Sequence, residues 1–299
     1  MLARKLLLVL GAVAWLNTTP VHAEEVSLDL DGMTLLGDVE GNVNAERFVV
    51  LVHGTLAHKD MELIDALQAA LSDRDISSLA ITLSLGISGR EGMYDCAVPH
   101  NHQMENSNAE IDAWMEWLGT QRSGPVALLG HSRGGARVAW YAAESPNPLI
   151  NEIVLMAPAY GDSMDDRLAG YKNRFGADLG AIIREARDLV ASGQGDTMVD
   201  MPGFLYCPDT QATAATVISY YDDDDRRSAP VMAEKIELPI LVIAGSLDTV
   251  VPEVPARFTP LADAGRVQLE IVDNADHMFL DFFAEDAADL IDGFVGSGS

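Results

Sequence analysis

The five residues Gly130-His131-Ser132-Arg133-Gly134 carry the clearest chemical signal in the sequence, a serine with a glycine two positions away on each side. An apolar run ends just before them, and a helical pattern begins just after them. In that context, G-x-S-x-G predicts a strained strand-to-helix turn that exposes the serine hydroxyl. The glycines leave room for neighbouring strands, and the N-terminus of the following helix favours developing negative charge. Ser132 is therefore the candidate nucleophile.

This motif and its position resemble the α/β-hydrolase superfamily, and the resemblance spans roughly residues 25–294. In that family the catalytic residues follow one another in the order serine, acid, histidine, each after a strand. The resemblance implies a mostly parallel central sheet flanked by helices. It also implies a serine hydrolase whose machinery needs no cofactor.

The acid is expected after the seventh strand of the family. Residues 239–244 are an apolar run of that kind, and a Gly-x-x-Asp turn that ends at Asp248 follows them. A carboxylate at this point would orient the histidine and stabilise its cation. A few relatives place the acid after the sixth strand, where Asp162 follows residues 156–158. Asp248 is the candidate acid, and Asp162 is the alternate.

The histidine is expected after the last strand, which residues 267–272 match, and His277 follows that run closely. An imidazole suits the role of general base at neutral pH. It would take the proton from Ser132 and later donate it to the leaving group. No other histidine follows both the serine and the acid, so His277 completes the candidate triad.

The oxyanion hole of such an enzyme needs two backbone N–H donors. One is expected from Arg133, the residue after the nucleophile. The second is expected in the loop that begins His53-Gly54-Thr55 and resembles the family's His-Gly loop. In relatives the residue after that pair donates, which indicates Thr55, while His53 is expected to be structural.

The elements that must position these residues alternate along the chain. A hairpin signal at Asp31-Gly32 joins two alternating strands, and later apolar runs alternate with helical patterns, which predicts a mostly parallel sheet covered on both sides. The predicted strands are 25–30, 33–39, 48–52, 77–83, 126–129, 152–156, 239–244 and 267–272. The predicted helices are 60–72, 108–119, 134–144, 253–262 and 280–291.

Residues 161–236 interrupt this alternation, because they contain no convincing buried strand. Helical stretches are predicted near 177–192 and 209–221 within them. A long insertion between sheet strands is most often a cap over the active site. We therefore expect one core made of residues 24–160 and 237–299, with a mainly helical cap of residues 161–236.

The loop from Ser84 to Ser107 is expected on the rim of the active site, at the carboxyl ends of the strands. It carries His100 and His102, which are weak evidence for a metal without a third ligand, so loop packing or substrate contact is favoured. It also carries Cys96, on the same side of the sheet as Cys207 of the cap. In an exported protein an even pair of cysteines favours a disulfide, and free thiols are the alternative. A bond between them would close a loop of about 110 residues.

The N-terminal segment reads as a secretory signal rather than as part of the fold. Arg4 and Lys5 precede an uncharged apolar run, Pro20 breaks it, and Ala23 offers a cleavage site. The run is about half of the ~20 residues needed to span a bilayer, so a retained anchor is the less favoured alternative. We expect residues 1–23 to be removed near Ala23 and the mature protein to be periplasmic or secreted.

The chain is strongly acidic, with a formal net charge of −27 that becomes −29 once residues 1–23 are removed. Such a surface repels nucleic acid and anionic lipid, so neither is expected as a partner. It also disfavours polyanionic substrates, unless a local basic patch overrides the field. The acidic run Asp222 to Asp225 could hold calcium, but a solvated turn is the favoured interpretation.

These observations predict an exported serine hydrolase that transfers an acyl group of a small-molecule substrate to water through an acyl-serine. Carboxylic esters are the favoured substrates, because the resemblance favours them and their chemistry is the least demanding. Three alternatives remain open at this stage. The same triad would serve an amidase or peptidase, some members of the fold use the serine for cofactor-free peroxide chemistry, and a non-catalytic binding protein could retain the fold.

Overall fold

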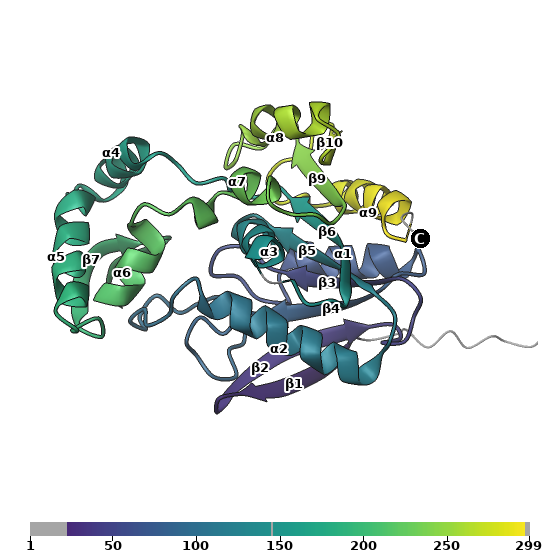
Figure 1. Cartoon of the computed structure of the whole chain (residues 1–299), viewed down its shortest axis with the longest axis horizontal. Helices are drawn as coiled ribbons and strands as arrows, with labels where there is room; N and C mark the ends of the chain where they lie inside the picture. The colour runs from purple at the N-terminus through teal and green to yellow at the C-terminus, as the bar shows by residue number, and fades with distance from the viewer. Residues whose placement is uncertain (1–22, 145, 297–299) are drawn as a thin grey trace, which may run out of the picture.

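The computed structural model describes residues 23–144 and 146–296, and the predicted signal segment lies outside these residues except for Ala23. Within the described chain, an eight-stranded sheet forms the centre of the molecule in the order β1-β2-β4-β3-β5-β6-β9-β10 (Figure 1). Its strands are β1 (Glu24–Leu30), β2 (Met33–Glu40), β3 (Phe48–Val52), β4 (Ser77–Thr82), β5 (Val126–His131), β6 (Ile150–Met156), β9 (Ile240–Gly245) and β10 (Gln268–Val272).

The predicted hairpin forms the antiparallel edge of this sheet. Asp31 and Gly32 both have positive φ, as the tight turn between β1 and β2 requires. β2 pairs antiparallel with β4, and the pairs from β4 through β3, β5, β6 and β9 to β10 are parallel. Every residue of β3 and β5 is buried, which explains the unbroken apolar runs of residues 48–52 and 126–129. The carboxyl ends of the parallel strands therefore meet along one edge.

Helices flank the sheet, as predicted. α1 packs against α9, whereas α3 packs against α2 and α7, so that both faces are covered (Figure 1). The flanking helices are α1 (Glu62–Ser72), α2 (Asn106–Gln121), α3 (Arg133–Glu144), α7 (Ala229–Ala233), α8 (Val254–Asp263) and α9 (Phe282–Phe294). The mostly parallel sheet with flanking helices confirms the predicted fold class.

The segment between β6 and β9 contains the largest departure from the sequence-based expectation. Before α7, its elements are α4 (Met164–Phe175), α5 (Leu179–Ala191), β7 (Met198–Phe204), β8 (Cys207–Thr213), α6 (Ala214–Tyr221) and the 3₁₀ turn η1 (Asp225–Arg227). β7 and β8 form an antiparallel hairpin, so the helix expected over residues 209–221 begins only at Ala214. Thr213 caps it, because its side chain accepts a hydrogen bond from the N–H of Thr216. Elements α4 to α6 form a lobe beside the sheet (Figure 1).

The hairpin was missed because its strands lack a clean alternating pattern. β7 contains Pro202 and Gly203, which are unfavourable inside strands, and residues 208–211 of β8 are all partly or fully exposed. β8 also pairs with a distant segment: His100 of the rim loop donates its N–H to the carbonyl of Gln211, and Thr213 donates to the carbonyl of His100. Local sequence cannot reveal a partner more than 100 residues away.

Candidate active site

Ser132 lies on the turn between β5 and α3 and has a φ of 56°, in the left-handed region. The turn is held by hydrogen bonds, because the Ser132 N–H donates to the carbonyl of Met156 and its own carbonyl accepts from Ala159, both at 2.9 Å. A Cβ at Gly134 would collide with the carbonyl oxygens of Val52 and His53 on the neighbouring strand and loop. The strained turn thus depends on the glycine of the motif.

Two further strand ends bring His277 and Asp248 to this serine. His277 follows β10, and its Nε2 lies 2.9 Å from Ser132 Oγ. Asp248 follows β9, and its Oδ2 lies 2.8 Å from Nδ1 of His277. All three residues are buried, with at most 9% of each exposed. The structure therefore assembles the three predicted residues into one continuous chain of hydrogen bonds.

The environment of Asp248 favours its ionised form. Burial alone would raise the pKa of this carboxyl, but the hydrogen bond to His277 and those from two backbone N–H groups outweigh it, so the pKa lies below its usual value. The backbone donors are Val250 at 2.7 Å and Val251 at 2.9 Å, both to Oδ1. A carboxylate fixed in this way can orient an imidazole and stabilise its cation.

His131, inside the G-x-S-x-G motif, has a positioning role that sequence reasoning missed. Its Nε2 donates to the carbonyl oxygen of His277 at 2.9 Å, and the two rings lie 4.9 Å apart. Burial foremost, and then the charge of His277, lower the pKa of His131 to about 4, so it is neutral at physiological pH. In the G-x-S-x-G motif the position of His131 can be any residue, so only its contact with His277 in the folded protein indicates its role.

The two predicted oxyanion donors lie on either side of the nucleophile. Thr55 follows β3 in a loop that approaches closely, since a Cβ on Gly54 would lie 3.2 Å from Cβ of Ser132. Arg133 is the first residue of α3, and its Nε donates to Oγ1 of Thr55 at 3.1 Å. In the described chain, neither backbone N–H of this pair has a hydrogen-bond partner. Both remain available to an oxyanion.

A cavity of about 460 Å³ opens in front of this chain of hydrogen bonds, a size that suits a small molecule. The inner side of the cavity is lined by Ser132, Thr55 and Arg133. We call these residues, with His277 and Asp248 behind them, the core wall. Residues of the inserted segment line the opposite side, which we call the cap wall. They include Tyr171 and Arg174 of α4, Tyr206 of the hairpin turn, Tyr220 and Tyr221 of α6, and Arg227 of η1.

The model of the alpha/beta hydrolase family matches residues 49–292. The chain belongs to the alpha/beta hydrolase family. No curated protein matches it in sequence.

Similar solved structures include the esterase Est1E of Butyrivibrio proteoclasticus, with 16% identity, a TM-score of 0.58 and coverage of 90% of this chain and 96% of that one. A monoacylglycerol lipase of Paleococcus ferrophilus has 20% identity, a TM-score of 0.58 and coverage of 88% and 98%. An esterase of Pyrococcus furiosus has 16% identity, a TM-score of 0.60 and coverage of 93% of each chain.

The remaining predicted site residues of this hydrolase have other surroundings. Asp162 lines the cavity, but in the described chain His277 bonds to Asp248 and not to this alternate acid. His53 lies in its turn with Nε2 accepting from the Leu83 N–H at 3.0 Å, and burial foremost lowers its pKa to about 3. Its contacts are those of a structural residue.

His100 and His102 belong to a buried aromatic cluster behind the cap wall. The ring of His100 stacks on Tyr94 with centroids 4.5 Å apart, and its Nδ1 lies 3.2 Å from Nε2 of His102. His102 Nδ1 in turn lies 3.0 Å from the hydroxyl of Tyr220, which lines the cavity. Across residues 23–144 and 146–296, no group of three metal-binding side chains is present. The two histidines pack the rim loop against the inserted segment.

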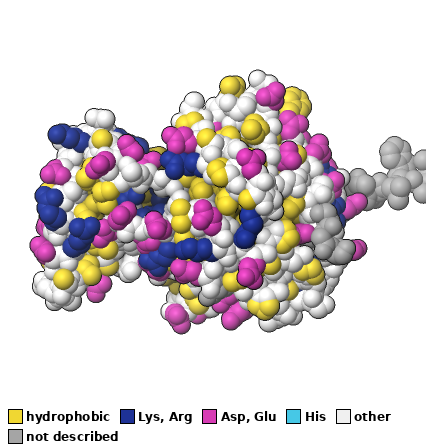
Figure 2. Space-filling model, turned by 45° about the horizontal axis from the view of Figure 1, so that its top comes forward, with side chains coloured by type: hydrophobic (Ala, Val, Ile, Leu, Met, Phe, Trp, Pro, Cys, Tyr) yellow, Lys and Arg dark blue, Asp and Glu magenta, His cyan; other side chains and the backbone are white. Residues whose placement is uncertain are grey.

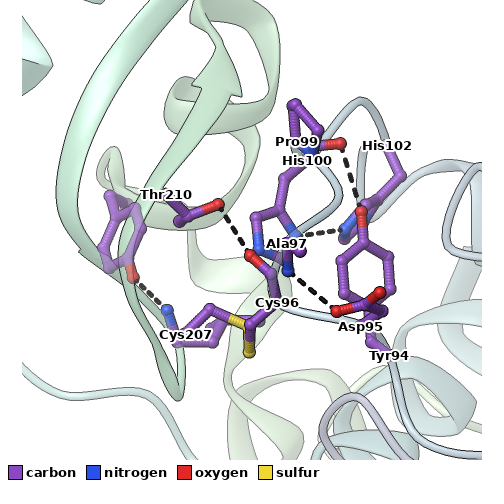
Figure 3. Close-up of a disulfide and its surroundings, with 11 residues drawn as sticks. Tyr94, Asp95, Cys96, Ala97, Pro99, His100, His102, Cys207 and Thr210 are labelled. Atoms are coloured by element: carbon purple, nitrogen blue, oxygen red, sulfur yellow. Dashed lines mark hydrogen bonds between the residues drawn. A yellow bond between two sulfur atoms is a disulfide. The ribbon is translucent and has the colours of Figure 1, made fainter.

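The two cysteines form a disulfide in the structure, between the rim loop and β8 (Figure 3). The Oγ1 of Thr210 on β8 donates a weak hydrogen bond to the carbonyl of Cys96 nearby. Two aspartates of the acidic run form ion pairs: Asp222 pairs with Arg187, and Asp224 pairs with Arg226. None of the helices in the described chain is long and apolar enough to cross a membrane.

Proposed function

We propose that this alpha/beta hydrolase cleaves carboxylic esters of small molecules through an acyl-serine, and that it does so outside the cytoplasm. The observation that carries the proposal is the hydrogen-bond chain from Ser132 through His277 to Asp248, with distances of 2.9 Å and 2.8 Å. The fold likeness to esterases and a lipase supports the reaction class. A second structure of the Butyrivibrio enzyme holds ferulic acid, and by analogy we propose that the substrate of this chain is also a small molecule.

The mechanism divides nucleophilic attack, proton transfer and oxyanion binding among the residues of the site. Ser132 Oγ attacks the ester carbonyl while His277 Nε2 takes its proton. The N–H groups of Thr55 and Arg133 hold the oxyanion that forms on the carbonyl oxygen. The protonated His277, stabilised by Asp248, gives its proton to the departing alcohol and leaves an acyl-serine. Water deprotonated by His277 then releases the acid.

The proposal of export has separate support. The charged and apolar N-terminal segment resembles a secretory signal, and a disulfide persists most readily in an oxidising compartment. Export is tested by expressing the full chain in bacteria and fractionating the cells. We expect a shortened protein that begins at Glu24 in the periplasm or medium, and a full-length cytoplasmic protein would contradict export.

The function is tested with chromogenic esters of increasing chain length and a Ser132→Ala variant. We expect the wild type to hydrolyse at least one ester and the variant to lose at least ~1000-fold in kcat. A fluorophosphonate probe should label the wild type and leave the variant unlabelled. Equal rates in both proteins would rule out Ser132 as the nucleophile, and an unlabelled wild type without turnover would favour the binding-protein alternative.

A further inference from the structure

Four arginines face the cavity, although the chain contains only 19 basic residues and 46 acidic ones. They are Arg133, Arg167, Arg174 and Arg227. In the described chain none of these four forms an ion pair with a carboxylate. Figure 2 shows basic side chains gathered on the smaller lobe and along its boundary with the larger body, while acidic side chains spread over the whole face. The cavity is thus a basic region within an acidic protein.

Arg227 is the most informative of these side chains. Only 7% of it is exposed, and its Nη1 donates to the carbonyl of Ser219 at 2.9 Å. Its Nε and Nη2 are buried and have no hydrogen-bond partner among the residues that the structure describes. Buried charged donors without partners are costly, so they indicate a place where a bound anion would supply the missing acceptors. The Nε and Nη2 edge of a guanidinium is the geometry that accepts a carboxylate with two parallel hydrogen bonds.

Arg133 places a second guanidinium next to the nucleophile. Its Nε is bound to Thr55, and its guanidinium carbon lies 5.9 Å from the centre of the Tyr220 ring. The charge of Arg133 contributes to lowering the pKa of Arg227, after burial and Arg167, which reflects how closely these cations are grouped. The pKa of Arg227 is about 10, so the group carries its charge at neutral pH.

The rest of the lining indicates what kind of anion fits. Asp162 and Asp166 also face the cavity, so against four arginines the formal charge of the lining is +2. Such a balance suits one negative charge and disfavours a polyanion. Five tyrosines and one phenylalanine offer flat apolar surfaces for the body of a ligand: Tyr160, Tyr171, Phe175, Tyr206, Tyr220 and Tyr221.

We infer that the cavity has an anion subsite in which Arg227 and Arg133 bind a carboxylate of the substrate, so that the preferred substrates are esters with a flat body and one free carboxylate. The inference deepens the proposed function and rests on it. The charge of the rest of the protein repels anions, so the subsite selects them at short range by hydrogen bonds.

The decisive experiment measures binding without turnover. The Ser132→Ala protein, with its disulfide formed, is titrated calorimetrically with phenylacetate and with phenylacetamide, which has the same shape and no charge. We expect phenylacetate to bind at least ~10-fold more tightly, as a charge-assisted hydrogen-bonded pair supplies. Equal affinities, or no binding of either molecule, would overturn the subsite.

Variants locate the preference. Arg227→Gln in the Ser132→Ala background should abolish the preference for phenylacetate, and Arg227→Lys should restore it only in part. Arg187→Gln is the matched control, because Arg187 lies on the same inserted segment but is exposed and paired with Asp222, away from the cavity lining. If Arg227→Gln does not fold, Arg133→Gln serves instead, since it retains the backbone N–H of the oxyanion hole. A preference that survives both substitutions would contradict the assignment.

Two further arms separate the alternatives. Benzylphosphonate tests whether the subsite prefers a phosphonate dianion. If it binds the Ser132→Ala protein more tightly than phenylacetate does, the assigned ligand group is a dianion and not a carboxylate. Hydrolysis by the wild type is compared for 4-acetoxyphenylacetate and 4-acetoxyphenylacetamide, with the released phenols separated by chromatography. Faster cleavage of the anionic ester supports the inference, and equal cleavage leaves the hydrolase standing while the subsite fails. If Ser132→Ala binds the anion but the wild type hydrolyses neither ester, the subsite stands and the proposed hydrolase function fails.

Discussion

The triad side chains of the core wall and Arg227 of the cap wall differ in how completely their polar groups are satisfied. On the core wall, both ring nitrogens of His277 are hydrogen-bonded and the carboxylate of Asp248 has three partners. On the cap wall, Arg227 keeps two buried donors without a partner in the described chain. The difference teaches that the core wall is preorganised for a reaction shared by all esters, whereas the cap wall is completed by one kind of substrate.

The largest effect is expected from breaking the core wall at Asp248. Asp248→Asn removes the charge that orients His277, and we expect kcat to fall by about 10⁴-fold. The loss should be equal for 4-acetoxyphenylacetate and its amide, because Asp248 acts on His277 and not on the charged group of the substrate. Asp162→Asn is the comparison, and a loss below ~10-fold there would support Asp248 as the acid. Steady-state kinetics measures both, and a larger loss in Asp162→Asn would reverse the assignment.

The second effect concerns how the cap wall is fixed to the core. A Cys96→Ser, Cys207→Ser double variant opens a link between residues 111 positions apart, which the chain-entropy model values at about 5 kcal/mol of unfolding free energy. Urea unfolding measures the loss. A reductant should destabilise the wild type in the same way and leave the double variant unchanged. A variant as stable as the wild type would show that the backbone pairing of His100 with β8 suffices alone.

The core wall could be predicted from sequence, but the cap wall could not. Ser132, Asp248 and His277 each follow a buried apolar strand, and parallel strand ends must meet at one edge, so local patterns and topology place them together. Arg227 follows an acidic run that the sequence presents as a solvated turn. Its burial depends on the packing of η1 and α7 against α3, which no short-range periodicity encodes.

The same limit explains the hairpin and His131. The backbone of His100 in the rim loop pairs with β8, and His131 matters because a loop 146 residues later turns its carbonyl toward it. In each case the decisive partner is distant in sequence and is a backbone group. Side-chain types at strand ends can be read from a sequence, whereas backbone partners are known only once the chain has folded.

The smallest effect tests three buried histidines whose pKa values lie far below the usual value. The pKa values of His53, His100 and His131 are about 3, 4 and 4, lowered foremost by burial. Below about pH 6.5 the unfolded chain binds protons at these sites that the folded chain does not bind, so stability falls as the pH decreases toward 4.

Each of these histidines should contribute about 1 kcal/mol of lost stability between pH 6.5 and 5.5. His100→Phe removes one of them while it retains the stacking on Tyr94 and Phe204, and the side-chain polar contact that it loses is the one between Nδ1 of His100 and Nε2 of His102. We expect the variant to lose about 1 kcal/mol less than the wild type over that pH interval, by urea unfolding at each pH. An unchanged pH slope would mean that His100 is protonated to the same extent in both states. The cluster behind the cap wall would then be solvated rather than buried.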